Sequence, residues 1–210
     1  MKKKVIEFWR RFIALFRGSS DVSKLDTHLP DFDPRKDEVI NTPMSEEYLK
    51  EIEENEKCAE AISECVDDRR LMKVAARSAT AEREGIDNTI TDEEVKENVR
   101  ALNMAILIPL MAATGWLYTI NSWFRSLLLN IRVGGARTSQ HLTGEAVDFW
   151  CRTILGVRLS TITVVRKILE LGLVFDQIIF YPNFVHVSFR RKGKNRGQIL
   201  YHSTYTGERL

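Results

Sequence analysis

Ser139-Gln-His-Leu-Thr-Gly-Glu-Ala-Val-Asp148 is the stretch from which the fold and chemistry of this chain can be argued, together with a later one, Phe184-Val-His-Val-Ser188. The two stretches contain His141, Asp148 and His186. Two imidazoles and a carboxylate are a ligand set for a divalent metal, and three protein ligands leave one coordination position open, as catalytic zinc sites do. The two stretches therefore predict a metal centre with an open position.

The local sequence explains how these ligands could converge. Gly144 and Ala146 are small, so the backbone between His141 and Asp148 can turn and pack closely. Residues 184–189 are apolar, β-branched or aromatic and read as a strand, in which alternate residues share a face. Taken singly, however, His186 could be a hydrogen-bonded core histidine, and Asp148 could be a capping or turn residue.

The pattern Ser139-x-His-x-x-Gly-x-Ala-x-Asp148 followed by His-Val-Ser188 resembles the signature of the zinc D-alanyl-D-alanine carboxypeptidases, peptidoglycan metallopeptidases of the Hedgehog/DD-peptidase fold. Landmarks of the phage and bacterial branch of that family follow in the same order at residues 78–88, 120–126, 130–135, 175–177 and 194–200. The resemblance implies an α+β fold with a small antiparallel sheet flanked by helices. It also implies that His141, Asp148 and His186 bind Zn2+.

The resemblance assigns a role to Arg125 as well. In the family the corresponding arginine helps to bind substrate and stabilises the oxygen that becomes negative when water attacks the peptide carbonyl. A guanidinium suits that task because it is always charged and offers paired donors; the alternative is an ordinary surface arginine. Trp123 stands where the family usually has glycine, and we expect it to narrow or reshape the pocket.

The general base is the point at which the sequence departs from the family. Many members place an Asp or Glu three residues before the last histidine, or a Glu shortly after the 175–177 landmark, whereas this chain has Asn183 and Tyr181 there. An amide cannot serve as a base, and a phenol is a poor proton acceptor near neutral pH. Glu145 and Asp176 are the carboxylates that could substitute, and Asp176 could instead orient a histidine that binds the metal.

Composition and charge suggest three regions. The chain has 210 residues, 44% hydrophobic and 29% charged, which is typical of a globular protein. Its net charge of +2 is uneven: residues 1–20 carry six basic and one acidic residue, residues 21–70 seven and sixteen, and residues 71–210 eighteen and twelve. We expect a basic amphipathic helix over 1–20, an acidic linker and helix over 21–70, and a zinc peptidase-like domain over 71–205.

The N-terminal region suggests a tether. Apolar residues recur at helical spacing on one face, namely Val5, Trp9, Phe12, Ile13 and Phe16. Such a helix could lie on an anionic membrane surface or dock on a virion or partner protein, and it could equally pack on its own or a neighbouring subunit. Arg10 and Arg11 interrupt any secretory signal.

The three cysteines, Cys58, Cys65 and Cys151, suggest no disulfide framework. In a helix Cys58 and Cys65 would lie too far apart for a bridge, and Cys151 is expected to be a core thiol. We therefore expect synthesis in a reducing cytoplasm, followed by action at the cell wall or carriage in a virion.

Secondary structure follows from hydrophobic pattern and from residues that start or end elements. We expect a helix from Thr91 to Thr114, a strand over 116–121, a helix over 157–173, and a hairpin of strands over 174–181 and 184–189. The first helix is apolar but interrupted by Pro109, so we expect a bent core helix rather than a transmembrane span. The basic residues of 190–196 suggest a solvated hairpin turn or contacts with an anionic cell-wall polymer. Without a recognised module, nucleic acid is an unlikely partner.

Two hypotheses of different classes follow. In the first, the chain is a zinc peptidase of phage or prophage origin that cuts peptidoglycan stem or cross-link peptides, as a carboxypeptidase or an endopeptidase. In the second, it is a binding or structural protein, such as a virion component, that keeps the fold and the metal but has lost efficient catalysis. Asn183 is the residue that keeps the second hypothesis open.

Overall fold

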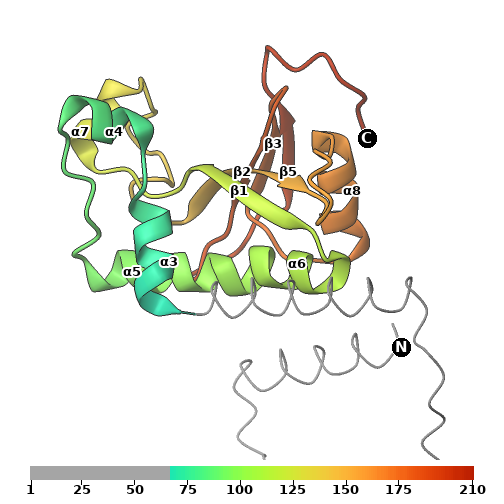
Figure 1. Cartoon of the computed structure of the whole chain (residues 1–210), viewed down its shortest axis with the longest axis horizontal. Coiled ribbons are helices and arrows are strands. Elements are labelled where there is room, and N and C mark those ends of the chain that lie inside the picture. The colour runs from blue at the N-terminus through green and yellow to red at the C-terminus, as the bar shows by residue number, and fades with distance from the viewer. Residues whose placement is uncertain (1–66) are drawn as a thin grey trace, which may run out of the picture. The chain divides into compact units, whose positions relative to one another are not determined.

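The computed structural model describes residues 67–210, which form an α+β fold around a five-stranded sheet (Figure 1). The helices are α3 Asp68–Ala76, α4 Ala79–Glu84, α5 Glu93–Leu102, the π-helical segment η2 Asn103–Leu107, α6 Ile108–Thr114, α7 Leu127–Arg132 and α8 Thr161–Glu170. The strands are β1 Leu117–Ser122, β2 Ala146–Arg152, β3 Gln177–Phe180, β4 Val185–Ser188 and β5 Gln198–Tyr201.

The strand order is β1-β2-β4-β3-β5. The pairs β1/β2, β2/β4 and β3/β4 are antiparallel, as expected, whereas β5 pairs with β3 in parallel. After β4 the chain crosses over β3, and β5 forms the edge of the sheet on the far side of β3. The predicted hairpin turn over residues 190–196 is therefore wrong: this segment is a crossover between strands that are not neighbours.

The predicted core helix is present, with two local differences. Asp92, not Thr91, is its N-cap, and the Asp92 side chain accepts a hydrogen bond from the backbone N–H of Glu94. The helix widens into η2 immediately before Pro109. Proline lacks the N–H that an α-helical turn would use, so a change of hydrogen-bond pattern beside it has a direct cause. Gly115, with φ +68°, ends the helix.

The two faces of the sheet differ because alternate residues of a strand point to opposite sides. One face carries the buried residues Val147, Phe149, Ile178, Phe180, Val185 and Val187. These residues share a core with Val99, Leu102, Ile106 and Leu110 of the long helix and with Val165 and Ile168 of α8. Figure 1 shows α5 and α6 following one another along the molecule, and α8 packs next to β3. The opposite face carries Asp148 and His186.

Within residues 67–210, no helix is long and apolar enough to cross a membrane. Cys151 is 1% exposed, and burial raises the pKa of its thiol to about 12, so it is a core thiol as predicted. The predicted helix over 1–20, the acidic segment that follows, and Cys58 and Cys65 lie outside the described residues.

Candidate metal centre

The three predicted ligands meet on the face of the sheet opposite the core. Asp148 on β2 lies directly opposite His186 on β4, and the loop before β2 supplies His141. The Nδ1 atom of His186 is 2.7 Å from Asp148 Oδ1, and the Nε2 atom of His141 is 3.3 Å from Asp148 Oδ2. One ligand atom from each side chain lies within 4.8 Å of the others. His141 and Asp148 are buried and His186 is 9% exposed.

The tautomer of His141 is fixed by a backbone group. Its Nδ1 lies 2.6 Å from the carbonyl oxygen of Trp123. A carbonyl can only accept, so Nδ1 carries the hydrogen and the Nε2 lone pair faces Asp148. Histidines that bind metals are commonly oriented in this way by a partner on the other ring nitrogen. His141 is therefore arranged as a ligand.

Asp148 is held as a carboxylate. Burial alone raises the pKa of a carboxyl group, but the neighbouring imidazoles of His141 and His186 outweigh that effect and hold the pKa of Asp148 well below its ordinary value. An ionised carboxylate between two imidazole nitrogens is a donor set that suits a divalent ion such as zinc. The residues present thus fit the metal that the sequence predicts.

Arg125 is part of this centre and is not a surface arginine. Its Nη2 lies 2.9 Å from Asp148 Oδ2, its Nε donates to Ser122 Oγ at 2.8 Å, and its backbone N–H donates to the carbonyl of His141 at 3.0 Å. Its side chain is 16% exposed. The register of β1 shifts between Ile120 and Ser122, just before this arginine. The guanidinium is therefore held in place next to the ligand carboxylate.

Trp123 lies beneath the ligand loop. The residue is fully buried, and its indole N–H donates to the carbonyl of Gly144 at 3.0 Å. Gly144 has φ +73°, and a Cβ there would lie 2.9 Å from Val99. The signature glycine is thus required by both its backbone angle and its packing.

The sequence model of the family described as Peptidase M15 matches residues 71–188 of the chain. This range covers more than half of the 210 residues and includes all three candidate ligands. The chain belongs to the peptidase M15 family. No curated protein matches it. M15 peptidases are zinc-dependent hydrolases, and the cluster of His141, Asp148 and His186 could hold a metal.

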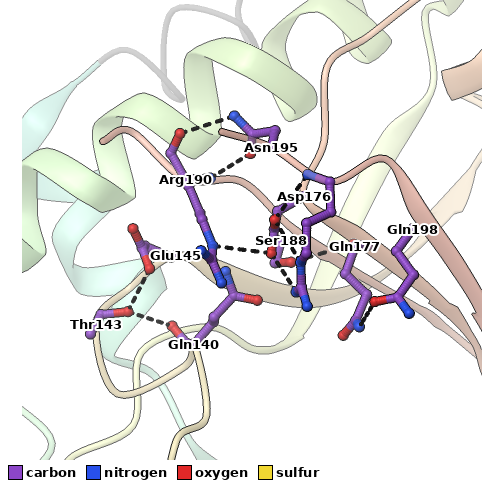
Figure 2. A network of polar contacts seen from close by, with 10 residues as sticks. Gln140, Thr143, Glu145, Asp176, Gln177, Ser188, Arg190, Asn195 and Gln198 are labelled. Carbon is purple, nitrogen blue, oxygen red and sulfur yellow. Dashed lines mark hydrogen bonds and ion pairs between the residues drawn. The ribbon is translucent and has the colours of Figure 1, made fainter. Parts of the chain in front are cut away.

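Neither substitute carboxylate points to this M15 metal centre. Glu145 lies three residues before Asp148, at the start of β2, and such an odd separation places two side chains on opposite faces of a strand. Its carboxylate accepts from Thr143 at 3.1 Å. Asp176 directly precedes Gln177, which pairs with Ser188 on the ligand face, so Asp176 points to the other side. Figure 2 shows Glu145 bonded to Thr143, and Asp176 in contact with Arg190.

The alternative role predicted for Asp176, orienting a histidine that binds the metal, is not supported by its contacts either. This aspartate is fully buried and accepts from the backbone N–H and the Nε of Arg196 at 3.1 and 2.9 Å, while Arg190 Nε lies 3.3 Å from its Oδ2. The Nδ1 atoms of His141 and His186 have other partners. Asp176 therefore holds the crossover segment to the start of β3.

The basic segment 190–196 is largely paired with acidic groups of the fold. Arg191 Nη2 lies 2.7 Å from Glu97 Oε2, and Lys192 Nζ lies 2.6 Å from Glu94 Oε1. These contacts join the segment to the first turns of α5. The segment is largely exposed, as predicted, but it is also anchored to α5. Charge count alone could not reveal these contacts, because the acidic partners lie about 95 residues earlier in the chain.

Asn183 is exposed in the turn between β3 and β4. Its backbone carbonyl accepts a hydrogen bond from Arg158, whose guanidinium also lies 4.2 Å from the ring centre of Trp150. The sequence analysis did not single out Arg158 or Trp150. Trp150 could have been found, because it lies two residues after Asp148 and so shares the ligand face once β2 is recognised as a strand.

Proposed function

We propose that the chain is a zinc-dependent peptidoglycan peptidase of phage or prophage origin, which acts on stem peptides as a D-Ala-D-Ala carboxypeptidase or a cell-wall endopeptidase. The observation that carries this proposal is the buried His141–Asp148–His186 cluster with Arg125 against it, on the face of the sheet opposite the core of an M15 domain. Burial strengthens the interactions of charged groups with a substrate.

The side chains divide the chemistry between them. His141, Asp148 and His186 would hold zinc, which supplies a Lewis acid that polarises a carbonyl and acidifies water. Arg125 would donate to the oxygen that gains negative charge as the peptide bond is attacked, because Ser122 and Asp148 fix its guanidinium. The carbonyl of Trp123 would keep the proton of His141 on Nδ1 throughout.

A second candidate is a metal-binding structural or virion component with impaired catalysis. The observation that favours it is the lack of a carboxylate base: Asn183 occupies one family position, and both Glu145 and Asp176 point to the other face of the sheet. General acid–base catalysis typically contributes about 10²–10⁴-fold. A domain without a base could keep its metal and fold while turning over slowly.

Hydrolysis of purified peptidoglycan by the zinc-loaded full chain tests the first proposal, with products identified by mass spectrometry. We expect free D-alanine or stem-peptide fragments, and neither from His186→Ala. Metal content is measured for both proteins beforehand, because the variant should bind zinc at least about 100-fold more weakly. Stoichiometric zinc in the wild type without any release would contradict the peptidase proposal and support the structural one.

We propose further that residues 1–70 attach the chain to a membrane surface, a virion or another partner protein. The supporting observation is the excess of basic residues in 1–20 and of acidic residues in 21–70. We propose also that the protein is made in a reducing cytoplasm and acts at the cell wall or is carried in a virion, which is consistent with that arrangement.

A further inference from the structure

The first described helix, α3, presents a basic surface to solvent. Its inner side is buried through Leu71 and Ala75, and it packs against α5 and β1. The exposed basic residues of its outer side are Arg69, Arg70, Lys73 and, at the C-cap, Arg77. The two aspartates at its start are engaged elsewhere, since Asp67 caps the helix and Asp68 pairs with Arg100.

A groove lies between α3 and β1, the strand at one edge of the sheet. Its lining contains the basic residues Arg70, Lys73 and Arg77 and the apolar or aromatic residues Val74, Tyr118 and Ile120. Within residues 67–210, no acidic side chain lines it. Lys73 has no ion-pair partner in that range, and Arg77 lies 4.0 Å from Glu82 with both side chains mostly exposed, where an ion pair contributes little. The groove therefore combines an apolar lining with positive charge.

The position of this groove suggests that another segment covers it. Tyr118 and Ile120 pack against the core but are only partly buried, and they lie on an edge strand. Folded proteins usually protect such an edge with a helix, a loop or charged residues. A segment that is both apolar and acidic would fit the lining of the groove and its charge.

The thirteen residues that directly precede Asp67 have that composition. Residues 54–66 contain four glutamates and one lysine. Apolar and thiol side chains recur at the spacing of one helix face, at Cys58, Ile62 and Cys65. Glutamates recur at intervals of four residues, at Glu56, Glu60 and Glu64. A helix of this segment would therefore carry one apolar face and one acidic face.

The chain connection favours the same segment. Asp67 is the N-cap of α3 and has an extended backbone, with φ −64° and ψ 109°, so a preceding helix cannot run straight into α3. Helices joined by a short connection pack as antiparallel neighbours. The nine residues of α3 span about 13.5 Å, and thirteen helical residues span about 20 Å. Residues 54–66 are thus long enough to lie along the whole of α3, with residues to spare for the turn.

We propose that residues 54–66 dock in the groove between α3 and β1 of the same chain. Their apolar face lies against Tyr118 and Ile120, and their glutamates face the basic residues of α3. Docking covers the edge of the strand that leads to Arg125. The folded domain then begins near residue 54, upstream of residue 71, and residues 1–53 remain as the tether. The inference does not depend on the proposed peptidase function.

Cross-linking in the full chain tests the docking with the chain's own thiols. Val74→Cys places a thiol in the groove, and a short bismaleimide should join it to Cys58 or Cys65, with the linked peptides identified by mass spectrometry. Cys151 is buried and should not react. Val133→Cys is the matched control, because Val133 is 43% exposed, against 41% for Val74, but does not line the groove. We expect the link from Val74→Cys to form at least about tenfold faster than any link from the control.

The role of charge is tested in the same Val74→Cys chain. Changing Glu56, Glu60 and Glu64 together to Gln should slow the cross-link about three- to tenfold, because ion pairs with exposed basic residues are lost. Changing Glu46 and Glu47 to Gln removes acidic charge outside the segment and should leave the rate unchanged. Circular dichroism verifies that each variant is folded.

A cross-link that forms equally fast from Val74→Cys and Val133→Cys, or from neither, overturns the docking. A link between two molecules does so as well, since the segment would then bind a second copy; it is recognised as a covalent dimer whose yield rises with protein concentration. An unchanged rate in the triple Glu→Gln variant overturns the charge match on which the choice of segment rests.

Discussion

At the scale of single residues, the candidate metal centre depends on two histidines that use different ring nitrogens. His141 directs Nε2 to Asp148 because its Nδ1 is bonded to the Trp123 carbonyl, whereas His186 directs Nδ1 to the same carboxylate. The rings meet edge to face, with centres 5.1 Å apart. If Asn or Gln replaced either histidine, the coordinating atom would lie at a different distance from Asp148. We therefore expect neither substitution to support metal binding.

Asn183 gives the most direct test of impaired catalysis. Replacing it with Asp places a carboxylate where many relatives have one, without changing the length of the side chain. If the peptidase is limited by the lack of a base, Asn183→Asp should raise kcat/KM on a stem peptide by about tenfold or more. Asn183→Ser, which changes the same side chain without adding a base, should show no gain, and an equal or lower rate in Asn183→Asp would argue that proton transfer does not limit turnover.

Glu145 should prove dispensable for chemistry. Its side chain accepts a hydrogen bond from Thr143, and its odd separation from Asp148 places it on the opposite face of the strand. Glu145→Gln is therefore expected to keep zinc stoichiometry and to change kcat by less than about twofold. A variant that retained its metal and melting temperature but lost turnover would instead place the general base at Glu145 and require the loop before β2 to rearrange when substrate binds.

At the scale of elements, the crossover from β4 to β5 is held by one buried carboxylate. Asp176 accepts three hydrogen bonds from Arg196, and Arg190 adds an ion pair. Burial raises the pKa of Asp176, but the bonds from Arg196 and the nearby charge of Arg190 lower it below its ordinary value overall. The ionised form is therefore the one that stabilises the fold.

Asp176→Asn should lower the free energy of unfolding by about 2 kcal/mol at neutral pH, since it removes charged hydrogen bonds from a buried site. Because the pKa is lower in the folded state, this contribution is complete above the unfolded value of about 4 and is lost as pH falls through the folded value. Denaturation curves followed by tryptophan fluorescence should thus converge for wild type and variant at low pH. A constant difference across pH 2–7 would exclude this role.

Much of the centre could be predicted from the sequence, and the failures have identifiable causes. His141, Asp148, His186 and Arg125 converge as expected, because motif residues on adjoining segments fix short-range geometry. Glu145 lies away from the ligands because the segment after Gly144 is a strand, as the alternation of Val147 and Phe149 indicates. The position of β5 beside β3 and the partners of residues 190–196 depend on contacts between distant parts of the chain, which local patterns do not reveal.

At the scale of the whole chain, the N-terminal 20 residues differ from the rest in their excess of positive charge. Residues 1–20 carry six basic residues and one acidic residue, and three of the lysines follow the first methionine directly. A lysine close to an anionic bilayer contributes about 1 kcal/mol of attraction, and salt screens that attraction within a Debye length. Attachment to a membrane through this segment would therefore be electrostatic in part and reversible by salt.

Replacing Lys2, Lys3 and Lys4 together with Gln in the full chain should weaken binding to vesicles that contain anionic lipid by about 100-fold, following from about 1 kcal/mol for each lysine. Cosedimentation at low and high salt measures the effect, and vesicles of neutral lipid should bind neither protein. As a control, Lys167→Gln and Lys194→Gln remove positive charge elsewhere and should leave binding unchanged. If the triple variant binds as the wild type does, or if salt has no effect, the basic segment is not a membrane tether, and attachment to a virion or partner protein becomes the better account of it.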